Sequence, residues 1–296
     1  MNDNEILRRT SRSFYLTIRL LPRSVREDVA LAYLLARATD TMADCSAASH
    51  PQRLAMLNSA RASLHAPSIA GYEASEWAHY QRDPAEQQLL SALPRLWSRM
   101  HEQRDGLVAG VLGSILEGQI LDLQRFAADS APLSDDELVR YTYLVAGSVG
   151  EFWTDLCAAR LGDFAADPLD VMRRRARHYG QALQLVNILR DRRMDEALGR
   201  SYVTATDTAR WTEQARAWLA DGSAYCAALR SGRLRYATLL PALLGERTLS
   251  LVAAQPADAL TPAKVSRSEL RKWMFRALPV WWSVQRVRTL VAAASE

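Results

Sequence analysis

The chain has 296 residues, of which 49% are hydrophobic and 24% are charged, so it can bury a sizeable core within an ordinary globular composition. The net charge is +4, and its positive part is almost all arginine scattered along the chain, with no basic stripe or nucleic-acid-binding motif. This balance argues against a nucleic-acid-binding protein. It is compatible with an anionic substrate or with loose association at an anionic membrane surface.

The three cysteines are odd in number and lack the spacing of metal ligands, so they suggest neither a disulfide framework nor a zinc site. The N-terminus has no apolar core of signal-peptide length, and no uninterrupted run approaches the roughly 20 apolar residues of a membrane span. We therefore expect a cytoplasmic protein in a reducing compartment.

The first part of the chain alternates helical patterns with loops. We predict a short helix and loop over residues 5–20, a long helix from Pro22 through Asp44, and a second helix over 51–64. An irregular stretch with two prolines and a glycine follows. Two further helices are expected over 84–128, with an interruption near 104–106.

The second part continues the same pattern. Ser134 and Glu137 form a capping-box pattern that predicts a helix from there to Gly162, and Asp167 with Pro168 opens the next helix. The remaining helices are expected over 208–231, 235–254 and 266–294, with breaks at Gly232, Pro241, Pro256, Pro262 and Pro279. No alternating strand pattern, linker or long repeat is present, so the prediction is one all-α domain over residues 1–296.

Acidic pairs recur on two of these predicted helices. In the 23-residue stretch 180–202, four polar residues set among apolar ones share one helix face, at steps of three, four and four: Gln184, Asn187, Asp191 and Asp195. Steps of four, three and four occur in the earlier helix, at Tyr33, Arg37, Asp40 and Asp44.

The chemistry of these pairs points to metal ions. Carboxylates among that much hydrocarbon need partners, because burying an unpaired charge is very costly. Magnesium prefers octahedral oxygen ligands, with one or two carboxylates, waters and phosphate oxygens. Two acidic faces looking at each other would hold a diphosphate through bridging magnesium. The alternative is two solvated faces paired with nearby arginines, and it is less plausible for two such pairs than for one.

Other motifs leave alternatives open. Ser11, Arg12 and Ser13, just before Phe14, suit a diphosphate, but a helix cap with a surface arginine explains them as well. The third acidic face, with Glu117 and Asp122 around Gly118, is explained equally by helix packing.

Small residues occupy one side of the predicted helix in segment 141–153. Ala146, Gly147 and Gly150 either let another helix close in or leave room for a long apolar ligand. Tyr141 and Tyr143 could meet a phosphate or a carbocation, although aromatic residues at helical spacing are more often core. Arg200 could neutralise a diphosphate or lie at the surface.

Taken together, the segments SRSF, YLLARATDTMAD, YTYLVAGSVG, ALQLVNILRD and GRSY resemble the squalene and phytoene synthase family. The resemblance runs in the right order from Ser11 to about Tyr202. It implies an isoprenoid synthase helical bundle around a central apolar cavity, with Mg²⁺ holding two prenyl diphosphates. The sequence departs from the family pattern at Met194, which bears on metal binding, at Leu144, which leaves the exact product open, and at Val203-Thr204.

The resemblance also assigns roles residue by residue. It implies metal binding at one set of positions: Asp40, Asp44, Asn187, Asp191 and Asp195. It implies catalytic roles for Tyr141, Asp122 and Arg37. It implies substrate contacts at a third set: Ser11, Arg12, Ser13, Phe14, Tyr33, Gln184, Arg200 and Tyr202.

The activity so implied is head-to-head condensation of two farnesyl diphosphates through presqualene diphosphate, followed by reduction with NADPH to squalene. The alternatives in the same class work without NADPH and give phytoene, dehydrosqualene, hydroxysqualene or presqualene diphosphate. A non-catalytic scaffold with the same fold is the alternative from another class, and loss of an aspartate would have favoured it. The expected partners are prenyl diphosphates, with no nucleic acid and with a peripheral membrane contact for product release.

Overall fold

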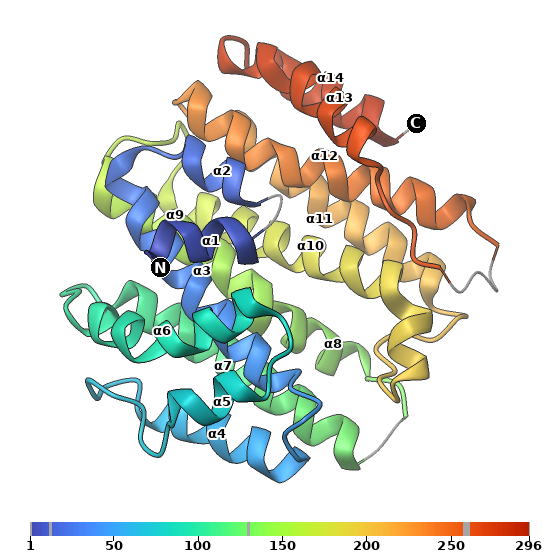
Figure 1. Cartoon of the computed structure of the whole chain (residues 1–296). Coiled ribbons are helices and arrows are strands. Elements are labelled where there is room, and N and C mark those ends of the chain that lie inside the picture. Colours follow the sequence, from blue (N-terminus) through green and yellow to red (C-terminus); the bar gives the residue numbers. More distant parts are fainter. Residues whose placement is uncertain (1, 12–13, 129–130, 257–260, 296) are drawn as a thin grey trace. The chain divides into compact units, whose positions relative to one another are not determined.

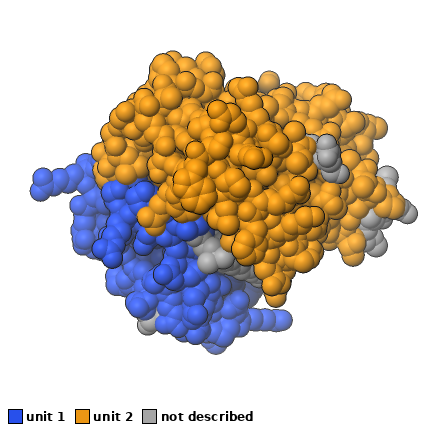
Figure 2. Space-filling view, turned by 90° about the horizontal axis from the view of Figure 1, so that it is seen from above, with its two compact units in different colours: residues 1–127 blue, residues 128–296 orange. Residues whose placement is uncertain are grey.

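The computed structural model describes residues 2–11, 14–128, 131–256 and 261–295, and its regular elements there are helices (Figure 1). The only β-type pairing in the described residues is a single bridge between Ala165 and Leu229. The predicted all-α fold class is therefore confirmed. By its contacts the chain divides into two compact units, Met1–Ala127 and Ala128–Glu296 (Figure 2).

Unit 1 is organised around α3 and α6, which pack on each other and receive the shorter helices. Its core is made of fully buried side chains such as Leu35, Leu89 and Trp97. Serine and aspartate caps start two of its helices, since Ser49 and Asp83 each accept a hydrogen bond from a first-turn N–H. The helices are α1 (Asp3–Thr10), α2 (Phe14–Leu20), α3 (Arg23–Ala43), α4 (His50–Ala62), α5 (Ala74–His79), α6 (Pro84–His101) and α7 (Leu107–Ala128).

Unit 2 is organised around α10, its longest helix, which contacts most of the other elements of the unit. Leu185 of α10, Leu219 of α11 and Leu243 of α12 are fully buried. The elements are α8 (Asp135–Thr142), the π-helical turn η1 (Tyr143–Gly147), α9 (Ser148–Leu161), α10 (Leu169–Ala197), α11 (Thr208–Ala228), α12 (Gly232–Ala254), α13 (Arg267–Ala277), the 3₁₀ turn η2 (Leu278–Trp281) and α14 (Gln285–Ser295).

Most predicted helices are present within a few residues of their expected limits, and the Ser134–Glu137 capping box is confirmed. Two predictions are wrong. The stretch expected to be irregular contains α5, six residues long, which buries Trp77 and packs on α6. Pro241 does not break α12, because that helix is held by packing on α10, α11 and α14, which outweighs the intrinsic penalty of a proline.

The helix expected over 134–162 is continuous in path but contains the π-helical turn η1. The small residues around it let a neighbouring helix close in, which was one of the two alternatives. A Cβ added at Gly150 would lie 2.0 Å from the carbonyl oxygen of Ala176, and one at Gly180 would lie 2.1 Å from that of Ala146. The η1–α9 segment and α10 therefore touch backbone to backbone.

Two helices have the length and mean hydropathy of a membrane span, α7 over Leu107–Ala127 and α12. About half of each is buried inside the protein (56% and 50%), as in core helices. Charged residues such as Glu117 and Glu246 interrupt both, which is why no uninterrupted apolar run of that length occurs in the sequence.

Candidate active site

The acidic face of unit 1 lies at the C-terminal end of α3. Asp40 is in the last turn of the helix and is half-buried, while the exposed Asp44 is the residue that caps it. The backbone N–H of Asp44 donates to the carbonyl oxygen of Asp40 at 2.9 Å. The two carboxylates are thus held one helical turn apart, as their spacing predicted.

Gln119 of α7 completes this face, and the sequence analysis did not name it. Its Nε2 donates to Oδ1 of Asp40 at 2.5 Å. Its Oε1 is buried and has no hydrogen-bond partner among the described residues. A buried acceptor of this kind suits a metal ion or a metal-bound water close to Asp40.

Burial raises the pKa of Asp40 to about 6, and the nearby carboxylate of Asp44 adds to the rise. The hydrogen bond from Gln119 and the charge of Arg37 act in the opposite direction. The fold therefore holds this carboxylate in an environment that disfavours its charge. A divalent cation would supply the missing compensation.

This raised pKa gives a prediction for the metal-free protein. The folded state keeps a proton on Asp40 up to about pH 6, whereas the unfolded chain loses it near 3.8, so folding stability falls as the pH rises through this interval. Replacing Asp40 with asparagine should remove that loss and stabilise the protein by up to about 3 kcal/mol at neutral pH. Urea unfolding of both proteins between about pH 3.8 and pH 6 measures this difference in the free energy of unfolding. Equal pH dependence of the two proteins would contradict the prediction.

Arg37, one turn before Asp40, has one nitrogen in an ion pair and another without a hydrogen-bond partner in the described part of the chain. Its Nη2 donates to Oε1 of Glu86 at 2.8 Å. Its Nε is buried and has no acceptor among the described residues. An anionic oxygen arriving at this position would satisfy that donor, which fits the phosphate contact implied by the family resemblance.

The acidic face of unit 2 lies in the C-terminal half of α10. Asp191 and Asp195 are partly exposed one turn apart, with Asn187 exposed one turn earlier. The helix ends directly after them. The backbone N–H of Arg200 donates to the carbonyl oxygen of Asp195 at 2.8 Å, which places the Gly199–Arg200 turn against this face.

Asp191 is held by Arg190, a second residue that the sequence analysis did not name. Nε of Arg190 donates to Oδ1 of Asp191 at 2.9 Å, and Nη2 donates to the other carboxylate oxygen. The carboxylate raises the pKa of the guanidinium, with the charge of Asp195 contributing. A residue directly before the first aspartate is not on its helix face, so face periodicity could not find it.

Two of the predicted tyrosines come together in unit 2. The rings of Tyr141 and Tyr202 stack with centroids 5.2 Å apart, and both are buried. Tyr141 comes from α8 and Tyr202 from the loop after α10. The segment just before α8 bonds to this loop, where the N–H of Leu133 donates to the carbonyl oxygen of Ser201. Tyr143, in contrast, donates to Glu151 and carries Arg177 over its ring.

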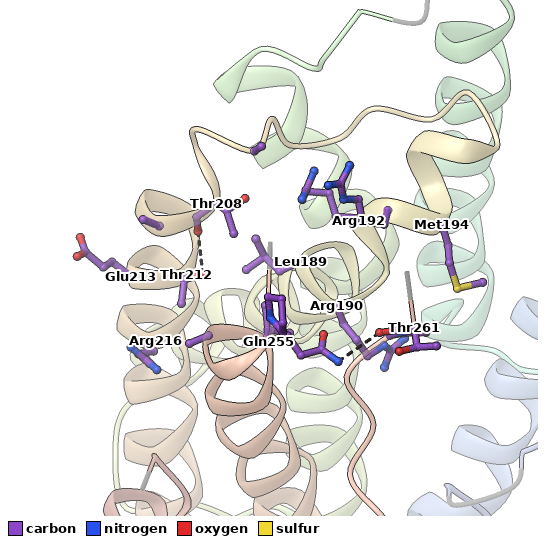
Figure 3. A pocket seen from close by; sticks show the side chains of 17 residues that line it. Leu189, Arg190, Arg192, Met194, Thr208, Thr212, Glu213, Arg216, Gln255 and Thr261 are labelled. Atoms are coloured by element: carbon purple, nitrogen blue, oxygen red, sulfur yellow. Dashed lines mark hydrogen bonds between the residues drawn. The ribbon is translucent and has the colours of Figure 1, made fainter. Parts of the chain in front are cut away.

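A pocket of about 490 Å³ lies beside this helix end, between α10, α11 and the loop after α12 (Figure 3). Arg190 and Arg192 enter it from α10, and Thr208 and Thr212 line it from α11. Arg193 and Arg216 complete a set of four arginines, with Glu213 as the acidic residue. Arg190 is paired with Asp191, and Arg192 and Arg193 with Glu196, so a phosphate bound here would share these guanidinium groups with carboxylates.

The remaining predicted residues are placed as follows. Ser11 is buried as the C-cap of α1 and donates to the carbonyl oxygen of Leu7, as a helix cap does. Tyr33 donates to the carbonyl oxygen of Thr10 at 3.2 Å. Asp122 is buried in α7, and Gln184 is half-buried in α10. Arg12 and Ser13 lie outside the described residues, and for Phe14 only its place at the start of α2 is described.

No group of three or more histidine, cysteine, aspartate or glutamate side chains gathers to form a metal site in the described part of the chain. The three cysteines are buried and free. The donors that fit a metal are thus two pairs of carboxylates. That donor set suits magnesium, which takes one or two carboxylates and completes its shell with waters and phosphate oxygens.

Comparison with known proteins decides the family. The model of the squalene/phytoene synthase family matches residues 7–212, which is more than half of the chain and includes both acidic pairs. The chain belongs to the squalene/phytoene synthase family. Members of this family are prenyltransferases of isoprenoid biosynthesis.

The relatives differ in product. A bifunctional lycopene cyclase/phytoene synthase of Phycomyces blakesleeanus is 32% identical over 262 residues, covering 87% of this chain and 41% of that protein. A presqualene diphosphate synthase of Zymomonas mobilis is 28% identical over 195 residues, covering 65% of this chain and 56% of that protein. The chain thus spans about two fifths to just over half the length of these relatives.

A solved complex of TcSQS with the ligand BPH1237 has the same fold. Its TM-score is 0.73 at 21% identity, and the match covers 99% of this chain and 96% of that one. The structural similarity extends beyond Tyr202, where the sequence resemblance ends, over the C-terminal third of the chain. The isoprenoid synthase fold is thus confirmed, while the central apolar cavity stays a prediction.

Proposed function

We propose that this protein condenses two prenyl diphosphates head to head in a magnesium-dependent reaction. The observation that carries the proposal is the pair of Asp-x-x-x-Asp motifs, each on a helix that buries an apolar face in its own unit, with Asp40 in an environment that calls for a cation. We propose further that the two units work as one catalytic domain over residues 1–296. The catalytic roles and substrate contacts that the family resemblance implies for the other site residues are part of the same proposal. The residues are Asp122, Ser11, Arg12, Ser13, Phe14, Tyr33 and Gln184.

Asp40, Asp44, Asn187, Asp191 and Asp195 would hold the metal. When bound, magnesium neutralises diphosphate charge and so favours its departure. Gln119 and Arg190 orient Asp40 and Asp191 through the hydrogen bonds described above. Arg37 and Arg200 contact the diphosphate directly, the former through the unpaired Nε.

Loss of one diphosphate from the first substrate leaves an allylic cation, which the double bond of the second substrate attacks. The resulting cation closes to the cyclopropane of presqualene diphosphate by losing a proton, which the released diphosphate can accept. The stacked rings of Tyr141 and Tyr202 offer π-electron density toward such a cation. Apolar surroundings keep water from quenching it. No general base is needed for the ionisation, in agreement with the lack of a histidine-based motif in the sequence.

We propose farnesyl diphosphate as the substrate and squalene as the product, formed through presqualene diphosphate with reduction by NADPH. Arg192, Arg193 and Arg216 of the arginine-lined pocket are the residues that would fit phosphates of the nucleotide. We place the protein in the cytoplasm, with a peripheral membrane contact through which the hydrocarbon product leaves.

The second candidate is phytoene or dehydrosqualene synthesis without NADPH, or a product that stops at hydroxysqualene or presqualene diphosphate. It is favoured by the relatives, which include phytoene and presqualene diphosphate synthases. A non-catalytic scaffold of the same fold is disfavoured because all four aspartates are present.

The test is incubation of the purified protein with magnesium and farnesyl diphosphate, with and without NADPH, and then with geranylgeranyl diphosphate. We expect a C30 hydrocarbon from farnesyl diphosphate that depends on NADPH, with presqualene diphosphate accumulating when NADPH is omitted. A C40 product would replace the squalene assignment with the phytoene one. No turnover of either substrate would overturn the enzymatic proposal.

A further inference from the structure

The C-terminal segment of unit 2 carries a surface unlike the rest of the described chain. Nine large hydrophobic side chains are exposed among the described residues of the chain, and four of them fall within ten residues of this segment. They are Phe275 (72% exposed), Leu278 (39%), Trp282 (81%) and Val284 (40%). Phe275 and Trp282 are the only aromatic residues among the nine. An apolar group of this density marks an interaction site.

Cations surround these side chains. Six arginines and lysines between residues 267 and 288 are exposed, and none of them forms an ion pair with a described carboxylate: Arg267, Arg271, Lys272, Arg276, Arg286 and Arg288. The segment's described acidic residue, Glu269, is paired with Arg247 of α12 at 3.0 Å. Elsewhere in unit 2, Arg177 and Arg210 are paired with acidic side chains, whereas Arg174 is exposed and forms no ion pair with described residues.

The charge of the whole chain depends on this segment. Residues 261–296 contain seven basic and two acidic residues, a net charge of +5, whereas the whole chain has a net charge of +4. The other 260 residues are therefore close to neutral, at −1. Both lysines of the chain, Lys264 and Lys272, lie here. This concentration of positive charge is not obvious in the sequence, because arginines also occur throughout the rest of the chain.

The aromatic and cationic side chains occupy one side of the segment. Arg271, Phe275 and Leu278 follow one another at steps of four and three, so they share a helix face. The opposite face, with Trp273 and Ala277, is buried. α13, η2 and α14 pack on α12 and lie along it at the edge of unit 2 (Figure 1).

The surface is fixed to the body of unit 2 rather than carried on a loose tail. Arg235 of α12 is buried, and its Nη1 donates to the carbonyl oxygen of Val280 at 2.7 Å. Tyr236 donates to the carbonyl oxygen of Met274 at 3.0 Å. The backbone at Trp281 passes so close to Gly232 that an added Cβ would lie 1.9 Å from its carbonyl oxygen. The exposed ring of Trp282 therefore extends from a rigid support.

We propose that this basic–aromatic surface, made of Arg271, Lys272, Phe275, Arg276, Leu278 and Trp282, docks the protein on an anionic lipid bilayer. Aromatic rings and aliphatic side chains insert at the interface, while arginine and lysine contact lipid phosphates. The cationic charge favours lipid headgroups over a second copy of this chain, which would bring the same charges together. The inference deepens the proposed function, since an apolar hydrocarbon product needs a lipid phase to receive it.

The test is co-sedimentation of the full chain with vesicles. We expect binding to vesicles of phosphatidylglycerol and phosphatidylcholine in equal parts, little binding to phosphatidylcholine alone, and weaker binding at high salt. The variant Phe275→Ser/Trp282→Ser should lose at least about tenfold in binding, and Lys272→Glu/Arg276→Glu should lose more, because each cation near the surface is worth about fivefold.

Two control variants match these changes. Val149→Ser removes an exposed apolar side chain elsewhere in unit 2, and Arg82→Glu/Arg174→Glu reverses two exposed arginines that form no ion pair with described residues. Neither the apolar nor the charge control should lose more than about twofold in binding. Equal loss in the controls and in the surface variants would overturn the proposal.

Lysine acetylation can identify the vesicle-bound surface in the unmutated protein. Because Lys264 and Lys272 are the only lysines, peptide mapping reads both directly. Lys272 should be protected from acetylation when vesicles are present. Unchanged reactivity on bound vesicles, or equal binding to neutral vesicles, would overturn the assignment, as would a dimer that depends on Phe275 and Trp282.

Prenyl diphosphate turnover is measured separately on the same proteins with soluble substrate and detergent. Vesicle binding without turnover would refute the proposed function alone. Turnover without vesicle binding would refute the docking surface alone.

Discussion

Replacing Asp40 or Asp191 with asparagine should lower turnover by roughly 10³-fold, equivalent to about 4 kcal/mol of lost transition-state stabilisation. The substitution keeps the shape of the side chain, the hydrogen bond from Gln119 at position 40 and one of the two from Arg190 at position 191, but it removes the negative charge that would hold magnesium. Steady-state rates with farnesyl diphosphate at saturating magnesium measure the effect. The magnesium concentration for half-maximal rate should rise in any variant with residual activity.

Loss of activity must be separated from loss of the fold, and Asp40 provides an internal check. Its asparagine variant should be inactive and yet more stable than the parent at neutral pH, since the buried charge is gone. An unfolded variant cannot show this combination.

The matched controls remove a charge from the same helices away from the acidic faces. Glu27→Gln in α3 and Asp170→Asn in α10 alter exposed residues that form no ion pair with described residues, and both should keep normal turnover. Full activity of Asp40→Asn or Asp191→Asn would refute the metal-binding role proposed for that residue.

The residues that sequence reasoning found share one physical property, which is periodicity. Asp191 and Asp195 lie on one face of α10 because a helix repeats every 3.6 residues, and a polar row in an apolar helix stands out in the sequence. The same reasoning located most helices, since caps such as Ser134 with Glu137 are local signals.

Two residues were missed in the sequence. One contacts a residue far away in the chain, and the other is a direct neighbour that does not lie on the polar face of the helix. Gln119 is 79 residues from Asp40 and reaches it only because α7 packs beside α3. Arg190 precedes Asp191 directly and bends back to its carboxylate. The π-helical turn η1 and the six-residue helix α5 were missed for a related reason: packing, and not local propensity, sets them.

The small residues of segment 141–153 could not be interpreted from the sequence alone. Their pattern allowed either a hollow for a ligand or a close approach of helices, and the position of α10 in the fold distinguishes the two. Gly150 and Gly180 are matched across the contact, each facing a carbonyl group of the other segment. This contact sets the separation between α10, which carries Asp191, and the segment η1 that follows Tyr141.

Substituting Gly180 with alanine should therefore destabilise the protein by about 3 kcal/mol or more, the upper range for overpacking in a core. Alanine is a better helix former than glycine by about 1 kcal/mol, so an uncrowded helical site would show the opposite sign. At Gly180 the added Cβ would lie 2.1 Å from the carbonyl oxygen of Ala146, and neither backbone can give way without separating the helices. Urea unfolding followed by circular dichroism measures the change.

Gly110→Ala is the matched control, because Gly110 is an exposed glycine in α7 with nothing within 4 Å of an added Cβ. It should be neutral or stabilise the protein by up to about 1 kcal/mol. Gly150→Ala should behave like Gly180→Ala, since its Cβ would meet the carbonyl of Ala176 at 2.0 Å. At temperatures where Gly180→Ala is still folded, turnover should also fall, because widening this contact shifts Asp191 relative to Tyr141. A stabilised and fully active Gly180→Ala variant would show that the two helices are not in backbone contact.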